Sequence, residues 1–199
     1  MLKYLVDVPN AITAIGLVLA IGAMHLTVNG HPDVAIGVLI WAVMLDHLDG
    51  LVARRMKNRP REYALVGGDM DSATDMVSAA IVPGLLAMQL AHGSILSLVS
   101  SVLIALAACL RVGYFNNFGL VETGRFYGVP MTYTAPITGL FFVIAKFWTS
   151  FSIAAVLPWE LIVMAALHVS PYGPPPLRGA GLLLVFLYAS VISMILILL

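Results

Sequence analysis

The sequence has few charged residues. Lys, Arg, Asp and Glu together make up 10% of its 199 residues, whereas hydrophobic residues make up 61%. Soluble domains usually carry about 25% charged residues, so this composition cannot cover a water-facing surface. The formal net charge of zero by itself says nothing about partners, and no nucleic-acid partner is expected. We therefore expect the chain to have the lipid bilayer as its solvent.

Cysteine is also nearly absent. The single cysteine, Cys109, lies inside an apolar run, so no intramolecular disulfide can form. No small-residue cleavage site follows the first apolar run, which we therefore interpret as a retained anchor rather than a signal peptide. The chain has no internal repeat and no low-complexity tract, and its polar interruptions are too short to separate domains. Residues 1–199 are thus expected to form a single membrane domain.

Long apolar runs are abundant. A helix needs about 20 residues to cross a bilayer core about 30 Å thick. Clusters of Gly, Pro and polar residues separate runs of roughly this length, and the weakest break lies at residues 148–150. The sequence predicts an all-α integral membrane bundle of six to seven transmembrane helices, or eight, with a polar metal site at its cytoplasmic end. The seven predicted spans cover residues 9–29, 34–53, 73–92, 95–115, 131–148, 151–169 and 179–199.

The basic residues predict how these spans cross the membrane. Cytoplasmic loops carry an excess of Lys and Arg. If the N-terminus is cytoplasmic, nine of the ten basic residues fall on or near the cytoplasmic side, and only Lys146 lies near the opposite face. This bias predicts a multi-pass protein of the cell membrane, with its polar site facing the cytoplasm and its C-terminus outside. The nine residues are Lys3, Arg54, Arg55, Lys57, Arg59, Arg61, Arg111, Arg125 and Arg178.

Two short polar stretches contain five of the ten acidic residues in the chain. At 3.6 residues per turn, Asp46 and Asp49 share one face of the second span. Asp71 and Asp75 are four residues apart and share one face at the start of the third span. The two spans are antiparallel neighbours joined by a short basic loop, so the two acidic faces are expected to converge at the cytoplasmic end of the bundle.

Converging carboxylates at membrane depth indicate a bound cation. Each ionised carboxylate costs roughly 2.5–3.5 kcal/mol to insert, and such groups usually mark a function. Oxygen ligands suit hard ions such as Mg²⁺, Mn²⁺ or Ca²⁺. The chain has no His and Cys set with zinc spacing, and His47 is expected to point away from the face that carries Asp46 and Asp49. The alternative is that these are ordinary helix-end acids neutralised by the basic loop.

Small residues next to the acids indicate a ligand between the helices. Gly50 follows Asp49 directly, and Gly67 lies four residues before Asp71. Glycine in a membrane helix allows a neighbouring helix or a ligand to approach the backbone closely, so packing alone is an alternative explanation. Arg54 is placed to pair with a phosphate group.

Together the two stretches resemble the signature of the CDP-alcohol phosphotransferase family, D-x2-D-G-x2-A-R-x8-G-x3-D-x3-D. All eight fixed positions are present. One departure is that twelve residues, rather than eight, separate the arginine from the second glycine, and we place the additional length in the loop at residues 55–66. The matching residues are Asp46, Asp49, Gly50, Ala53, Arg54, Gly67, Asp71 and Asp75.

The resemblance extends from residue 9 to about residue 170. Residues 9–13 look like the P-N-x-x-T opening of the first span in many members. Residues 111–116, residues 126–130 and residues 168–170 resemble segments of bacterial and archaeal phosphatidylserine synthases. Tyr114 departs from that pattern, because those enzymes usually carry a second arginine there.

The resemblance implies a metal-dependent phospholipid-synthesising enzyme, with two divalent ions (Mg²⁺ or Mn²⁺, with Ca²⁺ as a third candidate). It would move a phosphatidyl group from CDP-diacylglycerol to L-serine and release CMP. Asp46, Asp49, Asp71 and Asp75 are the implied metal ligands, with Asp75 also the general base. The implied CDP-binding residues are Gly50, Ala53, Arg54, Gly67, Asn10 and Thr13, and those for the acceptor or lipid phosphate are Arg111 and Asn116.

Two alternatives are open at this stage. Within the family, the acceptor could be inositol phosphate, glycerol phosphate or choline instead of serine. In a different class, a divalent-cation channel or transporter could use the aspartates as ion ligands, although the full signature and the absence of a second acidic cluster argue against transport. The resemblance also implies a homodimer, because members of the family commonly form one.

Overall fold

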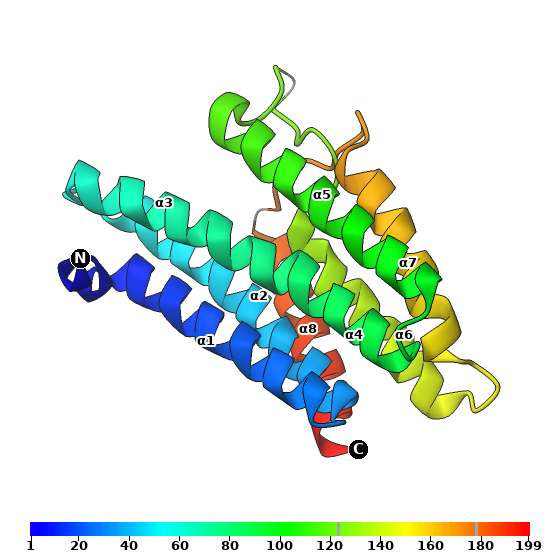
Figure 1. Ribbon diagram of the computed structural model, residues 1–199. Helices are drawn as coiled ribbons and strands as arrows, with labels where there is room; N and C mark the ends of the chain where they lie inside the picture. The colour runs from blue at the N-terminus through cyan, green and yellow to red at the C-terminus, as the bar shows by residue number, and fades with distance from the viewer. Residues whose placement is uncertain (123, 178) are drawn as a thin grey trace.

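The computed structural model describes residues 1–122, 124–177 and 179–199, and these residues form an all-helical bundle without strands (Figure 1). Short 3₁₀ turns occupy η1 (Leu2–Val6) and η3 (Met131–Tyr133), and a π-helical turn, η2 (Val77–Ile81), joins two of the helices. The α-helices are α1 (Val8–Val28), α2 (Pro32–Arg55), α3 (Arg61–Met76), α4 (Val82–Leu90), α5 (Ile95–Phe118), α6 (Thr134–Phe147), α7 (Ile153–His168) and α8 (Ala180–Leu198).

The predicted all-α membrane bundle is confirmed. Among the described residues, five helices are long and apolar enough to cross a membrane: α1, α2, the continuous helix Arg61–Leu90, α5 and α8. Two further apolar helices, Met131–Phe147 and Ile153–His168, are shorter. The weak predicted break near residue 150 is therefore real, and each predicted span corresponds to one helix.

The third helix differs from the prediction at its beginning. Hydropathy predicts a span from residue 73, but the helix begins at Arg61. Residues 61–72 are polar enough to fall outside an apolar window, although their backbone continues the same helix. The extra residues placed in the loop at 55–66 are accordingly only partly loop, because α2 ends at Arg55 and α3 begins at Arg61.

The π-helical turn η2 follows the acidic part of this helix directly and precedes Pro83. Proline lacks a backbone N–H group, and its ring clashes with the carbonyl group four residues earlier in a regular α-helix. A wider π turn relieves this clash, and π turns occur mostly as single insertions inside α-helices. The turn lets the chain continue as one long helix past the acidic residues.

The turn between α1 and α2 ends one helix and begins the next within four residues. Gly30 adopts a φ of +81°, which glycine tolerates without steric cost. The N–H groups of Gly30 and His31 then donate to the carbonyl groups of Thr27 and Leu26, at 3.2 and 2.9 Å, in a Schellman arrangement. Pro32 follows at the first turn of α2, where its missing N–H group costs nothing. The turn makes α1 and α2 antiparallel neighbours (Figure 1).

Helix α2 lies at the centre of the bundle and packs against α1, α6 and α8. Its buried apolar residues include Ile36, Leu39 and Ile40, which are completely inaccessible to solvent. Close approach to α8 depends on a small residue: a Cβ atom on Gly37 would lie 2.8 Å from a side-chain carbon of Ile197. Large apolar side chains on the outer faces of α1, α5 and α8 are exposed, as expected for helices that face lipid.

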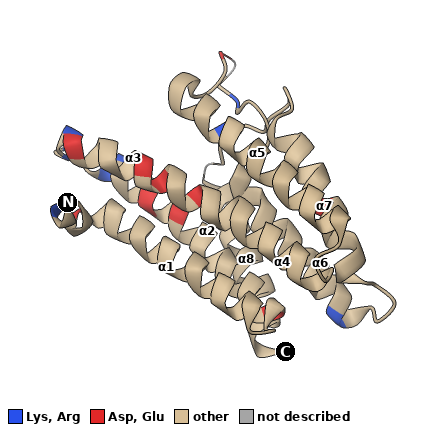
Figure 2. Ribbon diagram, in the orientation of Figure 1, with Lys and Arg blue, Asp and Glu red and all other residues tan. Residues whose placement is uncertain are grey.

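Charged residues gather toward one end of the bundle (Figure 2). At the other end, Lys146 at the end of α6 forms an ion pair of 2.9 Å with Asp33 at the beginning of α2. Lys146 therefore lies at the opposite end of α2 from Arg54 and Arg55. This position agrees with the prediction that Lys146 lies near the opposite face of the membrane from the other basic residues. Arg178, which the orientation argument assigns to the basic end, lies outside the described residues.

Candidate active site

The first half of the site lies on α2. The apolar beginning of this helix packs in the core, and Asp46 and Asp49 follow one turn apart near its basic end. Asp49 is 6% exposed, and its Oδ2 atom accepts a hydrogen bond from the Oγ1 atom of Thr13 on α1. Neighbouring α1 therefore orients one of the two carboxylates.

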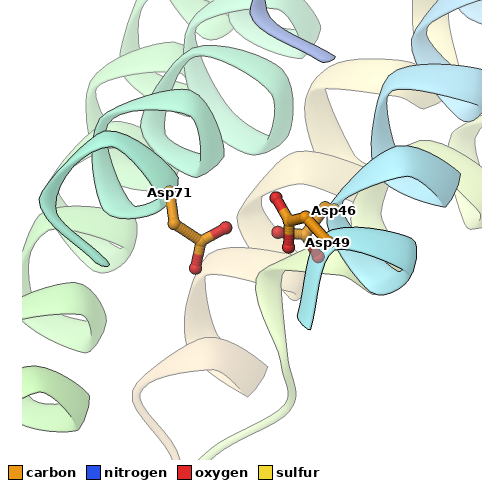
Figure 3. A group of neighbouring side chains, drawn as sticks. All are labelled: Asp46, Asp49 and Asp71. Atoms are coloured by element: carbon orange, nitrogen blue, oxygen red, sulfur yellow. The ribbon is translucent and has the colours of Figure 1, made fainter. Parts of the chain in front are cut away.

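The second half of the site lies on α3. The carboxylate of Asp71 points across from α3 toward Asp46 and Asp49 on α2 (Figure 3). One carboxylate oxygen from each of these three residues lies within 4.8 Å of the others. The predicted convergence of the two acidic faces is thus present for three of the four residues. Asp75 lies one turn further along α3 and lines the same cavity.

This donor set fits a divalent cation. Three carboxylates at such short separation repel one another unless protons or cations lie between them. The buried Oδ1 atom of Asp71 has no hydrogen-bond partner within the part of the chain that the structure describes, and an orphaned buried acceptor of this kind calls for a ligand. Oxygen-only ligands are typical of Mg²⁺, Mn²⁺ and Ca²⁺. Asp46, Asp49 and Asp71 could together hold such an ion.

The acids line a cavity of about 410 Å³. Helices α2, α3 and α5 form most of its wall, and residues 126, 130–133, 176–177 and 182 complete it. Arg111 on α5 lines the cavity and is 9% exposed, whereas Arg54 on α2 lines it from a more exposed position. Asn116 also lines it, and its Nδ2 atom donates a hydrogen bond of 2.9 Å to Ser72 on α3. The cavity therefore combines an acidic side with two arginines.

The family model for CDP-alcohol phosphatidyltransferase matches residues 6–171, which is most of the chain. The chain belongs to the CDP-alcohol phosphatidyltransferase family. It is also 29% identical, over 160 residues, to an archaetidylserine synthase from Methanothermobacter thermautotrophicus. That alignment covers 78% of this chain and 64% of the relative, so the chain spans less than two thirds of the relative's length.

Membership of this family supports a role in phospholipid synthesis. The family is generally dependent on divalent metals, in agreement with the carboxylate triad. The apolar helices and the family indicate that this chain is a membrane protein.

The structure divides the predicted CDP-binding residues into two groups. Gly50 and Arg54 line the cavity. The other four (Asn10, Thr13, Ala53 and Gly67) are not among the described residues that line it. Thr13 instead donates to Asp49, as described above. For these four residues, a nucleotide contact stays a prediction from the family resemblance.

Asn10 takes part in a partly buried hydrogen-bond network with Arg59. The Arg59 guanidinium donates to Asp7 Oδ2 and Asn10 Oδ1, each at 2.6 Å. The Nδ2 atom of Asn10 donates to the carbonyl groups of Tyr4 and Tyr63, at 3.0 and 3.2 Å. The backbone of α3 comes so close at Gly67 that a Cβ atom there would collide with Asn10 Oδ1. Arg59 thus fastens the α2–α3 loop to the beginning of α1.

The sequence prediction for His47 is wrong. His47 lines the cavity, with its Nδ1 atom 3.5 Å from Asp46 Oδ2 and 3.0 Å from the carbonyl oxygen of Val43. Helical spacing places it about 100° from Asp46, and the cavity wall is wide enough to include both positions. Phe126, from the stretch 126–130 that resembles the family, and Tyr133, which no local pattern marks, also line the cavity. The folding of the α5–α6 connection brings both residues there.

Proposed function

We propose that this phosphatidyltransferase moves a phosphatidyl group from CDP-diacylglycerol to the hydroxyl group of L-serine, giving phosphatidylserine and CMP. The observation that carries the proposal is the convergence of Asp46, Asp49 and Asp71 in a cavity that also contains Asp75 and Arg111. The name of the relative, archaetidylserine synthase, supports serine as the acceptor.

In the proposed reaction, the serine hydroxyl oxygen forms a bond to the β-phosphorus of the donor while the bond from that phosphorus to the CMP oxygen breaks. Asp75 accepts the proton of the hydroxyl group, since it lines the cavity beside the triad and a positioned carboxylate can act as a general base. Arg111 holds an anionic group of a substrate, for which its guanidinium is well suited. CMP leaves with the bridging oxygen.

Asp46, Asp49 and Asp71 would hold the divalent ions, which are Mg²⁺ or Mn²⁺ with Ca²⁺ as a third candidate. When bound, such ions neutralise the diphosphate of the donor and the charge that develops on the departing CMP. Gly50 leaves space beside the acids for the nucleotide: a Cβ atom there would lie 3.4 Å from the guanidinium of Arg54. Arg54 can therefore approach a phosphate over this glycine.

The same proposal includes the surroundings of the enzyme. The basic residues at the site end of the bundle support a cavity that opens to the cytoplasm, in a protein of the cell membrane. Residues 1–199 are proposed to act as one domain. A homodimer stays a prediction from the family resemblance.

The deciding experiment is a CMP-release assay on the purified protein. It uses CDP-diacylglycerol with Mn²⁺ or Mg²⁺ and a panel of serine, inositol phosphate, glycerol phosphate and choline, with reactions lacking alcohol or containing a chelator as controls. Release that depends on serine supports the proposal. Release only with another alcohol would replace the acceptor and keep the reaction class. No release with any alcohol, together with divalent-cation flux in liposomes, would overturn the enzymatic proposal in favour of transport.

A further inference from the structure

A buried histidine outside the cavity connects to the arginine inside it. His168 is the last residue of α7, is 1% exposed and does not line the cavity. Its Nδ1 atom lies 2.9 Å from the carbonyl oxygen of Val129, and its Nε2 atom lies 3.0 Å from Oγ1 of Thr134. The same Val129 oxygen accepts a hydrogen bond of 2.8 Å from Nε of Arg111. One carbonyl group therefore joins the histidine to the arginine.

The hydrogen-bond partners determine the tautomer of His168. A carbonyl oxygen can only accept, so the Nδ1 atom must carry the proton that bonds to Val129. A neutral imidazole then has an acceptor at Nε2, which receives the hydroxyl proton of Thr134. Thr134 is completely buried at the beginning of α6. Arg111 of α5 and His168 of α7 thus meet at the carbonyl group of Val129, and the other side of the His168 ring bonds to Thr134 of α6.

The backbone around Val129 is held on the end of α7 by further contacts. The N–H group of Val129 donates to the carbonyl oxygen of Leu167 at 3.0 Å. Gly128 has a φ of +78°, and a Cβ atom there would collide with the carbonyl group of His168. The chain can approach α7 this closely only because residue 128 is glycine. The carbonyl group of Val129 is consequently held in one position, and it orients the side chain of Arg111.

Arg111 is held on two sides, with the rest of its guanidinium available to a ligand. Its Nε atom is bonded to Val129, and its guanidinium carbon lies 5.5 Å from the centre of the Phe126 ring, within the range of a cation–π interaction. Among the described residues, the carbonyl oxygen of Val129 is the one hydrogen-bond partner of the Arg111 side chain. Arg111 and Asp75 line the same cavity, and the proposed function places the acceptor hydroxyl beside Asp75.

We propose that His168 is a positioning residue for acceptor binding, acting through the Val129 carbonyl group on Arg111, which binds the carboxylate of the acceptor. The inference rests on the proposed function for the identity of the acceptor. A phosphate group could bind to the same guanidinium. The experiments below distinguish binding of a carboxylate from binding of a phosphate. The Nδ1–H donor, rather than the bulk of the imidazole, is what matters.

Two substitutions of His168 distinguish the effect of its Nδ1–H donor from the effect of the imidazole ring. His168→Asn keeps an N–H donor the same number of bonds from Cβ as Nδ1, whereas His168→Gln moves the donor to the position of Nε2. Loss of one hydrogen bond predicts about a 3- to 10-fold rise in the KM for serine in His168→Gln, with the KM for CDP-diacylglycerol unchanged. His168→Asn should stay near the wild-type value. Ser193→Ala removes a hydrogen bond from α8 to Gly37, far from this chain of contacts, and controls for general loosening.

A double-mutant cycle tests the route through Arg111. In an Arg111→Lys background, His168→Gln should raise the serine KM no further, because the Nε donor to Val129 is already lost. If the two substitutions raised the serine KM additively, the proposal would be overturned. So would an unchanged serine KM in His168→Gln, or a rise confined to the donor KM, which would assign Arg111 to a phosphate.

Hydrogen–deuterium exchange and binding measurements decide the inference if the wild-type protein releases no CMP, which would be a failure of the proposed function alone. Exchange in residues 126–130 should be faster in His168→Gln and unchanged in His168→Asn and Ser193→Ala. Isothermal titrations with L-serine and with inorganic phosphate then compare the two anions. Weaker serine binding in His168→Gln supports the inference. Exchange or serine binding equal to wild type would overturn it.

Discussion

Thr13 on α1 donates a hydrogen bond from its hydroxyl group to the Oδ2 atom of Asp49 on α2. Both residues are buried, at 4% and 6% exposure. Asp49 belongs to the carboxylate triad, so the neighbouring helix determines which way one of the proposed metal ligands points. Thr13, which the family resemblance predicts to contact CDP, thus also has a direct contact with the acidic cluster.

We expect Thr13→Val to lower CMP release by about 10- to 150-fold, since a hydrogen bond to a charged group contributes about 1.5–3 kcal/mol. The measurement is turnover as a function of Mn²⁺ concentration, in which the half-saturating concentration should also rise. The matched control is Thr27→Val on the same helix, because Thr27 is also buried and, among the described residues, its hydroxyl group donates to the carbonyl group of Ala23 alone. Equal losses in both variants would contradict a specific role for Thr13.

Asp75→Asn should abolish turnover while largely preserving the binding of the CDP-lipid. General-base catalysis contributes about 10²- to 10⁴-fold, and the amide cannot accept the proton of the acceptor hydroxyl. Single-turnover CMP release and equilibrium binding of CDP-diacylglycerol measure the two effects separately. The control is Asp69→Asn, which changes an exposed acid on the same helix. Normal turnover in Asp75→Asn would show that another group is the base.

Asp49→Asn should weaken the binding of Mn²⁺ and of the CDP-lipid together, because both depend on charge at the triad. Titration calorimetry with Mn²⁺ alone measures the first, and chelation of the metal should stop CMP release by the wild-type protein. Glu160→Gln serves as the control, since Glu160 is a buried acid that bonds to Thr138 on α6 and does not line the cavity. Retained Mn²⁺ affinity in Asp49→Asn would contradict its role as a ligand.

Arg59→Ala should lower the free energy of unfolding by about 1–3 kcal/mol, the cost of leaving a largely buried hydrogen-bonding group without its partner. The side chains of Asp7 and Arg59 are 5% and 12% exposed, and their closest atoms are 2.6 Å apart. The measurement is thermal unfolding in detergent, with a lower midpoint expected. Arg61→Ala is the control because Arg61 is exposed at the beginning of α3. A midpoint equal to that of this control would argue against the network.

The sequence was sufficient to predict the parts of this molecule that depend on local pattern. Hydropathy located each apolar helix, and the four-residue spacing of Asp71 and Asp75 placed both on the cavity side of α3. Hydropathy missed the beginning of α3 at Arg61, because a helix facing a polar cavity need not be apolar there.

Long-range contacts could not be predicted in this way. Arg59 lies in a short loop and looks like one more basic residue of the cytoplasmic side, yet it bonds to Asp7 and Asn10 more than 45 residues away. His168 likewise receives its connection to Arg111 only when the α5–α6 connection folds onto α7. Neither of these contacts follows from the spacing of residues along the sequence.

The π-helical turn at Val77–Ile81 constrains how this part of the chain can change during evolution. Each residue of an α-helix turns the following residues by about 100°. Deleting one residue between Asp75 and Pro83 would therefore rotate the acids on α3 relative to Gly84, which packs against Ser101 on α5. Either the carboxylates would leave the cavity or the helix contact would be lost. The structure consequently constrains the length of this short segment even where its side chains touch no substrate.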